Sequence, residues 1–325
     1  MPGTTRPPFD PELEAVLAAL ADTLPPTLTP EMIPALRDGG AALAPPIEDL
    51  LAGRPITHRE VTVAGHEGGE ITLSIFARSD HATAGPGIFH IHGGGMIIGD
   101  RFTGIDVPLE WVERFDAVCV SVEYRLAPEF PDPYPVEDCY AGLTWTARNA
   151  ADLGIDPARL IVAGGSAGGG LSAGTALLAR DRQGPALSGQ VLIYPMLDDR
   201  NETVSSHQIA GVGVWDRGSN DTGWDAYLGD RRRTDAVSIY AAPARATDLS
   251  GLPPAYIDVA TAEVFRDEVV AYASQIWADG GVAELHVWPG GFHRFDQMAP
   301  ASYLGQAART TRTNWVARHF GAAPQ

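Results

Sequence analysis

Lysine is absent from this sequence of 325 residues, so all 23 basic side chains are arginines. Acidic residues number 41, and the formal net charge at pH 7 is -18. A surface this acidic repels the phosphates of nucleic acids and of anionic lipids, so we expect no nucleic-acid partner and no role at a membrane surface. The net charge also disfavours anionic substrates, although the local field around a cleft can differ from the global sum.

Cysteine is scarce, and long apolar runs are missing. Cys119 lies in an apolar run and Cys139 in a predicted helix, and we expect both to be buried free thiols. No stretch is long enough to span a bilayer, and the first residues lack the apolar segment of a signal peptide, which predicts a soluble, cytoplasmic protein. No residues show the spacing of metal ligands, and we expect neither a metal nor an organic cofactor.

Hydrophobic residues make up 45% of the chain, which is enough for a substantial core. Short β-type runs alternate with helical patterns, which predicts an α/β fold: a mostly parallel, eight-stranded sheet with helices on both faces. The first two runs have the alternation of a hairpin, and the later ones are more continuously apolar. The predicted strands are 57–63, 71–77, 87–91, 117–123, 160–163, 190–194, 255–260 and 284–288. The predicted helices are 106–115, 136–152, 167–182, 263–279 and 302–319.

Two segments lie outside this alternation. Residues 1–50 look helical and partly amphipathic, whereas residues 198–235 form a polar, glycine-containing excursion between two predicted strands. A long excursion of this kind is more often a lid or a binding element than an empty loop.

The strongest chemical signal is the segment 164–168, Gly-Gly-Ser-Ala-Gly, which follows a predicted strand and precedes a predicted helix. A Gly-x-Ser-x-Gly pattern in this context predicts a nucleophile elbow, a tight turn that presents Ser166 at the carboxyl end of the sheet. A glycine-rich dinucleotide loop is the rival interpretation. That loop needs an acidic residue at the end of the next strand, and the candidates Asp198 and Asp199 follow that strand by several residues.

Two further motifs follow predicted strands. The segment 92–95, His-Gly-Gly-Gly, comes directly after the strand at 87–91. Consecutive glycines let backbone N–H groups converge on one point, as an oxyanion hole requires. His293 follows the strand at 284–288 and a glycine turn, where the base belongs in the chain order serine, acid, histidine.

Together these motifs resemble the hormone-sensitive-lipase family of α/β-hydrolases, which includes the bacterial family IV esterases. The resemblance covers nearly the whole chain. It rests on the segments 92–95, 124–129, 134–138, 164–168, 193–195, 265–268 and 290–293.

The resemblance implies an α/β-hydrolase fold with a helical cap. The cap elements would be residues 1–50 and 198–235, and the catalytic core residues 55–197 and 236–325. It also implies that the backbone N–H groups of Gly94, Gly95 and Ala167 form the oxyanion hole and that His92 shapes the glycine loop. Members of the family often dimerise through the last strand, so a homodimer is expected by resemblance.

The acid of the triad follows from the same resemblance. Relatives carry an aspartate shortly before Arg-Asp-Glu, and anchoring on that motif puts Glu263 in its place. Asp258 and Asp267 are the alternatives. A glutamate can orient the imidazole as aspartate does, with one more methylene of reach. The chain departs from the family pattern at Gly165, where relatives carry aspartate or threonine, and at Arg294, where they often carry glycine.

These features predict a serine carboxylesterase with Ser166 as nucleophile, His293 as base and Glu263 as the orienting acid. We expect it to hydrolyse small-molecule esters with short acyl or aryl groups. Met96, Ile97 and Trp215 are candidate walls of the substrate pocket. An amidase or acyltransferase with the same triad remains an alternative, as does a non-catalytic ligand-binding protein on the same scaffold.

Overall fold

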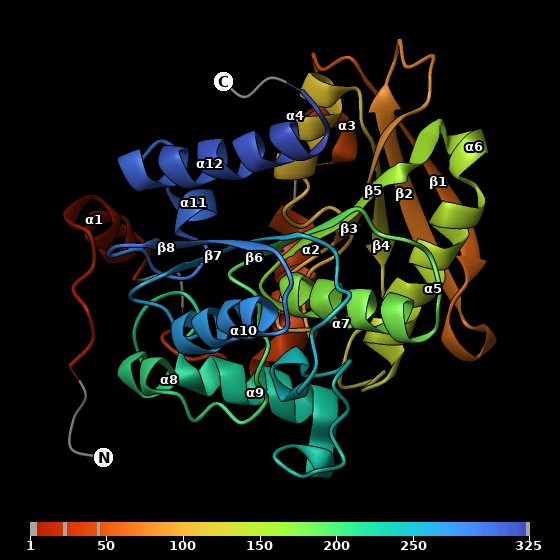
Figure 1. Cartoon of the computed structure of the whole chain (residues 1–325). Coiled ribbons are helices and arrows are strands. Elements are labelled where there is room, and N and C mark those ends of the chain that lie inside the picture. Colours follow the sequence, from red (N-terminus) through yellow and green to blue (C-terminus); the bar gives the residue numbers. More distant parts are fainter. Residues whose placement is uncertain (1–4, 22–24, 44–45, 323–325) are drawn as a thin grey trace.

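One twisted sheet of eight strands forms the centre of the molecule (Figure 1). The computed structural model describes residues 5–21, 25–43 and 46–322. The strand order is β1-β2-β4-β3-β5-β6-β7-β8; β2 runs antiparallel to β1 and to β4, and all other neighbours are parallel. The strands are β1 Ile56–Ala64, β2 Glu70–Arg78, β3 Gly85–Ile91, β4 Val118–Glu123, β5 Ile155–Gly165, β6 Gly189–Ile193, β7 Ala255–Ala260 and β8 Ala283–Trp288.

Helices cover both faces of this sheet. In Figure 1, α4 and α12 lie on one face, and α5, α7 and α10 on the other. Every residue of β3 and of β7 is buried, which explains why their sequences read as continuous apolar runs. The helices of the core are α4 Asp106–Phe115, α5 Tyr134–Arg148, α6 Ala150–Leu153, α7 Ala167–Asp181, α10 Arg266–Ala278, α11 Phe295–Met298 and α12 Tyr303–His319. Short 3-10 turns occupy Pro30–Met32, His66–Gly68, Gly229–Arg231 and Pro243–Arg245.

The predicted sheet and its opening hairpin are confirmed, and so are the predicted helices at 106–115, 167–182 and 302–319 to within a residue. The helix predicted at 136–152 is two helices, α5 and α6, which meet at Asn149, and the short α11 was not predicted. The helix expected from residue 263 begins only at Arg266, since residues 261–265 form a turn after β7. That turn keeps Glu263 at the carboxyl end of the sheet instead of placing it on a helix. The two cysteines, Cys119 and Cys139, are buried free thiols, as expected.

Helices also fill the two segments that lie outside the alternation. The first contains α1 Pro11–Leu20, α2 Ile33–Leu43 and α3 Ile47–Leu51, and the second contains α8 Val204–Gln208 and α9 Arg217–Leu228. The two segments meet: the Leu28 N–H donates to Ser219 Oγ over 2.8 Å, and Thr222 Oγ1 donates to the Leu28 carbonyl over 2.8 Å. Residues 1–4, 22–24 and 44–45 of the first segment lie outside the described residues. The cap itself stays a prediction.

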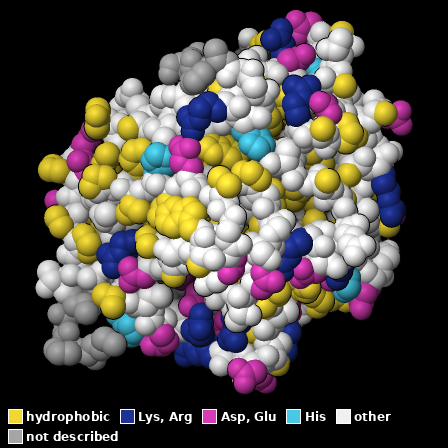
Figure 2. All heavy atoms as spheres, in the orientation of Figure 1, with side chains coloured by type: hydrophobic (Ala, Val, Ile, Leu, Met, Phe, Trp, Pro, Cys, Tyr) yellow, Lys and Arg dark blue, Asp and Glu magenta, His cyan; other side chains and the backbone are white. Residues whose placement is uncertain are grey.

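The surface is mixed in charge despite the net charge of -18. Figure 2 shows basic and acidic side chains interspersed over the visible face. In the part of the chain that the structure describes, no helix is both long and apolar enough to cross a membrane. The expected homodimer stays a prediction; β8, through which it would form, is an edge strand of the sheet.

Candidate active site

Ser166 lies in the turn between β5 and α7, with a positive φ of 59°. The turn depends on its glycines, because a β-carbon at Gly168 would collide with the backbone carbonyls of Ile91 and His92. A β-carbon at Gly164 would collide with the backbone of Gly168 in the same way. Backbone strain held by close packing is typical of functional turns, and here it presents the hydroxyl at the carboxyl end of the sheet.

Two loops bring the predicted partners to this hydroxyl. His293, in the loop after β8, places Nε2 at 2.9 Å from Ser166 Oγ. Glu263, in the turn after β7, places Oε1 at 2.5 Å from His293 Nδ1. Its second oxygen accepts a hydrogen bond from the Ala260 N–H over 3.1 Å. A bonded carboxylate fixes the ring so that Nε2 faces the serine as an acceptor.

All three side chains are buried, since Ser166, Glu263 and His293 are at most 5% exposed. Burial raises the pKa of Glu263, and the attraction of its carboxylate to His293 opposes that rise. Rings of Tyr194 and Phe265 pack edge-on against the imidazole, with centroids 5.0 and 5.2 Å away, and hold it in place.

The other two carboxylates considered for the acid role have different partners. Asp258 lies within β7 and accepts a hydrogen bond from Arg312 over 2.9 Å. Asp267 accepts from the Ser205 N–H and from Arg266 Nε, both over 2.7 Å. Of the three candidates, the structure brings Glu263 alone to His293.

The glycine loop after β3 lies against the serine turn. A β-carbon at Gly93 would stand 2.7 Å from the Gly165 carbonyl, so the two backbones touch. Among the described residues, the N–H groups of Gly94, Gly95 and Ala167 donate to no protein acceptor, and they are free to bind an oxyanion. Gly94 and Gly95 both have positive φ, 116° and 62°, which glycine adopts without strain.

His92 shapes this loop, as expected. Its ring stacks on Tyr124 with centroids 4.1 Å apart, and its Nδ1 lies 2.8 Å from the Gly93 carbonyl. The Tyr124 hydroxyl donates to the His92 carbonyl over 3.0 Å. Burial lowers the pKa of His92, which favours the neutral ring.

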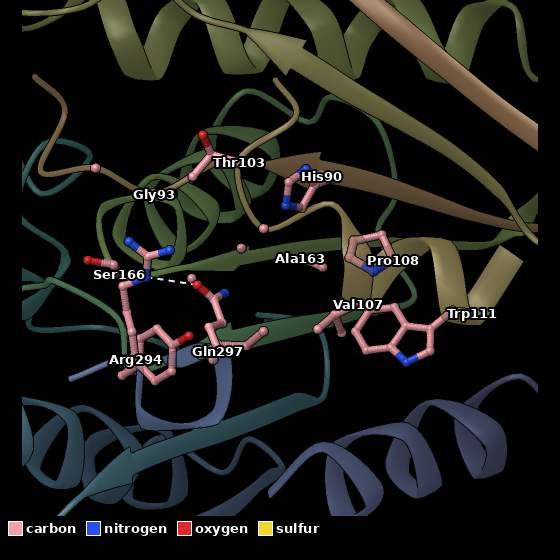
Figure 3. A pocket seen from close by; sticks show the side chains of 16 residues that line it. His90, Gly93, Thr103, Val107, Pro108, Trp111, Ala163, Ser166, Arg294 and Gln297 are labelled. Carbon is pink, nitrogen blue, oxygen red and sulfur yellow. Dashed lines mark hydrogen bonds between the residues drawn. The ribbon is translucent and has the colours of Figure 1, made fainter. Parts of the chain in front are cut away.

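A small cavity of about 40 Å³ opens beside Ser166 (Figure 3). Its walls come from the ends of β3, β5 and β6, from the Gly93–Gly94 loop, and from the α4 residues Val107, Pro108 and Trp111. Arg294 and Gln297, which follow His293 in the chain, line its remaining side. A water needs roughly 10–15 Å³ by this measure, so the cavity holds a group of only a few heavy atoms.

The predicted pocket residues lie nearby but are not among the residues that line this cavity. Met96 and Ile97 are fully buried behind the glycine loop. Trp215 packs on that loop, where a β-carbon at Gly95 would collide with its indole ring. Their role as substrate walls stays a prediction. Sequence reasoning missed the α4 wall, although α4 is the first helix after the glycine loop.

Gly165 departs from the family pattern, in which a larger residue stands before the serine. A β-carbon there would stand 3.4 Å from the Tyr194 ring and 3.8 Å from Ile193, which are ordinary contacts. The position therefore accommodates a β-carbon.

Comparisons with known proteins agree with this geometry. Residues 88–297 match a family model described as the α/β-hydrolase fold. The chain is 35% identical over 308 residues to carboxylesterase NlhH of Mycobacterium tuberculosis, a match that covers 93% of this chain and 94% of that one. It is 33% identical to esterase LipI of the same species, over 85% of each chain.

Solved structures give the same result. A bacterial heroin esterase superimposes with a TM-score of 0.88 at 37% identity, covering 96% of this chain and 98% of that one. Esterase LipW from Mycobacterium marinum superimposes with a TM-score of 0.85 at 32% identity, covering 97% and 98%.

Proposed function

Since this chain belongs to the hormone-sensitive-lipase-like family of α/β-hydrolases and is a serine carboxylesterase, we propose that Ser166, His293 and Glu263 are its catalytic triad. The observation that carries the proposal is the continuous chain of hydrogen bonds from Ser166 Oγ through His293 to the Glu263 carboxylate. The three residues lie in separate loops that follow β5, β7 and β8, all at the carboxyl ends of the strands.

The mechanism follows from these contacts. Ser166 Oγ attacks the ester carbonyl while His293 Nε2 takes its proton, and Glu263 stabilises the resulting imidazolium. The developing oxyanion accepts hydrogen bonds from the backbone N–H groups of Gly94, Gly95 and Ala167. One such donor contributes about 3 kcal/mol to transition-state stabilisation in comparable enzymes. His293 then protonates the departing alkoxide, and a water molecule attacks the acyl-serine by the same route to release the acid.

The cap would be formed by residues 1–50 and 198–235. Support comes from contacts next to the glycine loop: Arg37 in α2 donates from Nε to the Ile97 carbonyl over 2.7 Å and from Nη2 to the Ala127 carbonyl over 2.6 Å, and the Ala127 N–H in turn donates to the Met96 carbonyl. Trp215 touches the same loop at Gly95. Both segments thus support the backbone that would bind the oxyanion.

Short acyl groups are the expected substrates, because the cavity beside Ser166 admits only a few heavy atoms. Hydrolysis of p-nitrophenyl esters should be fastest with acetate to hexanoate and should fall steeply towards palmitate. The measurement is kcat/KM across the series, with enzyme-free buffer as the blank. A maximum at long chains would contradict the small acyl site and would require the cap to open widely.

Activity should fall as the pH is lowered, because protonation of the Glu263 carboxylate removes the charge that orients His293 and stabilises the imidazolium. Burial raises the pKa of Glu263 above that of an ordinary glutamate, so the carboxylate loses its charge at a higher pH. The enzyme should therefore be active at neutral pH and should lose activity on acidification. The check is kcat/KM from about pH 5 to 9, read at the isosbestic wavelength of p-nitrophenol. A flat profile would contradict the role assigned to the Glu263 carboxylate.

A further inference from the structure

Arg294 brings a positive charge to the wall of the cavity beside Ser166. It follows His293 directly, and Figure 3 shows its guanidinium hydrogen-bonded to Gln297 at the cavity. The acceptor is an uncharged amide, since Arg294 Nε donates to Gln297 Oε1 over 2.8 Å. Among the described residues, the terminal nitrogens of the guanidinium donate no hydrogen bond to the protein.

No carboxylate of the described chain forms an ion pair with Arg294. None of the residues that line the cavity is an aspartate or a glutamate. The buried carboxylates nearby have other partners: Arg312 alone is shared by Asp258 and Asp296, over 2.9 and 3.0 Å, and Glu263 lies against His293. Gln297 offers its Nε2 as a further donor, because its oxygen is occupied by Arg294 and no hydrogen bond within the described chain uses that nitrogen. The wall therefore presents donors and lacks an anionic acceptor.

The backbone at Arg294 also departs from what its residue type favours. Its φ is 65° and its ψ is 23°, the left-handed region that glycine occupies without strain. A non-glycine residue held there raises the free energy of the folded state, and such positions cluster at functional sites. A long cationic side chain at a strained position next to the base suggests a use for the charge.

We propose that Arg294 binds a carboxylate of the substrate, so that the preferred substrates are short esters that carry a carboxylate, such as monoesters of small dicarboxylic acids. The inference rests on the proposed esterase function. A guanidinium presents paired donors that fit a carboxylate, and its charge cannot be lost by deprotonation. The overall charge of -18 weakens long-range attraction of an anion, but Arg294 is the one side chain with a permanent charge among the described residues that line the cavity.

Matched ester pairs test this inference with the wild-type protein. In the first pair the carboxylate lies on the acyl side: monoethyl succinate carries it, and the neutral isostere ethyl 4-oxopentanoate has a methyl ketone in its place. In the second pair the carboxylate lies on the leaving-group side: 3-acetoxypropanoate carries it, and 4-acetoxybutan-2-one is the neutral isostere. Followed by pH-stat titration, kcat/KM should favour the anionic member of at least one pair by about 10- to 100-fold, the effect of a charge-assisted hydrogen bond.

Substitutions then assign the preference to Arg294. Arg294→Gln should lower the anionic-to-neutral ratio of kcat/KM by about the same factor, whereas Arg294→Lys should retain part of it. Arg318→Gln is the matched control, because Arg318 is 48% exposed and pairs with Glu284 on the surface. It should leave the ratio unchanged.

A wild-type ratio of one or less in both pairs would overturn the inference, even where a variant failed to fold. An unchanged ratio in folded Arg294→Gln would overturn it as well. Both results leave the neutral esters hydrolysed and the proposed function standing. Absence of turnover on all four esters, in folded wild-type protein, would instead contradict the proposed function itself.

Discussion

Replacing Ser166 by alanine is expected to lower kcat for p-nitrophenyl acetate by a factor on the order of 10⁴ to 10⁶. The substitution removes the oxygen that forms the acyl intermediate, and no other group can replace it. The residual rate would come from the oxyanion donors acting on a water molecule. The fold should persist, because the hydrogen bond of Ser166 Oγ is made to His293 and a methyl group occupies less space.

Ser172→Ala is the matched control for this substitution. Ser172 also lies in the buried segment around α7, and its hydroxyl donates to the Gly168 carbonyl over 2.7 Å. Its loss should lower stability by about 1 kcal/mol and leave kcat nearly unchanged. Thermal unfolding and steady-state rates of both variants separate the two effects. A Ser166→Ala protein with a near wild-type rate, or with burst kinetics, would rule out this nucleophile.

Replacing Glu263 by glutamine should lower kcat by a factor on the order of 10⁴. Glutamine keeps the shape of the side chain but loses the charge that stabilises the imidazolium, and its amide nitrogen can turn His293 to the wrong tautomer. Glu263→Asp keeps the charge and shortens the side chain by one methylene, so it should retain more activity than the glutamine variant. Rates of both variants are measured with saturating p-nitrophenyl acetate.

Asp267→Asn is the control, because Asp267 lies four residues further on and binds the Ser205 N–H and Arg266. It should change kcat by less than about threefold, as expected for a group that touches no reacting atom. A larger loss in Asp267→Asn than in Glu263→Gln would move the acid role to Asp267. If kcat fell only slightly in both variants, neither carboxylate would be required to orient the imidazole.

The sheet could be predicted from the sequence because its signal is local. Strands such as β3 and β7 are buried on both faces, so their apolar runs stand out, and the helices between them carry their own periodicity. The boundary error at residue 263 has a physical cause. Residues 261–265 contain helix-compatible side chains, but the backbone turns there to bring Glu263 back to Ala260.

The position of Ser166 could be predicted for a related reason. The elbow is a strand, a tight turn and a helix in immediate succession, so its glycines mark it without tertiary information. The acid was harder, since Asp258, Glu263 and Asp267 lie within ten residues of one another. Spacing relative to the family motif selected Glu263, and only the structure shows that its side chain reaches His293.

The cavity could not be read from the sequence. Trp111 on α4 and Gln297 on α11 are 186 positions apart and meet only because α4 and α11 lie on the same face of the sheet. The helices in residues 198–235 could be expected from the resemblance alone, because glycine, asparagine and aspartate in α9 have low helix propensity. Capping by Asp216, which accepts from the Ser219 N–H over 2.8 Å, and contacts with the N-terminal segment stabilise α9 instead.

Covalent labelling with a fluorophosphonate tests the central claim most directly. The reagent phosphonylates an activated serine and can be located by peptide mass spectrometry. The account predicts one adduct per chain, on the peptide that carries Ser166, with loss of esterase activity in step with labelling and no adduct in Ser166→Ala. An adduct on a different residue, or full hydrolysis by a protein that takes no label, would contradict it.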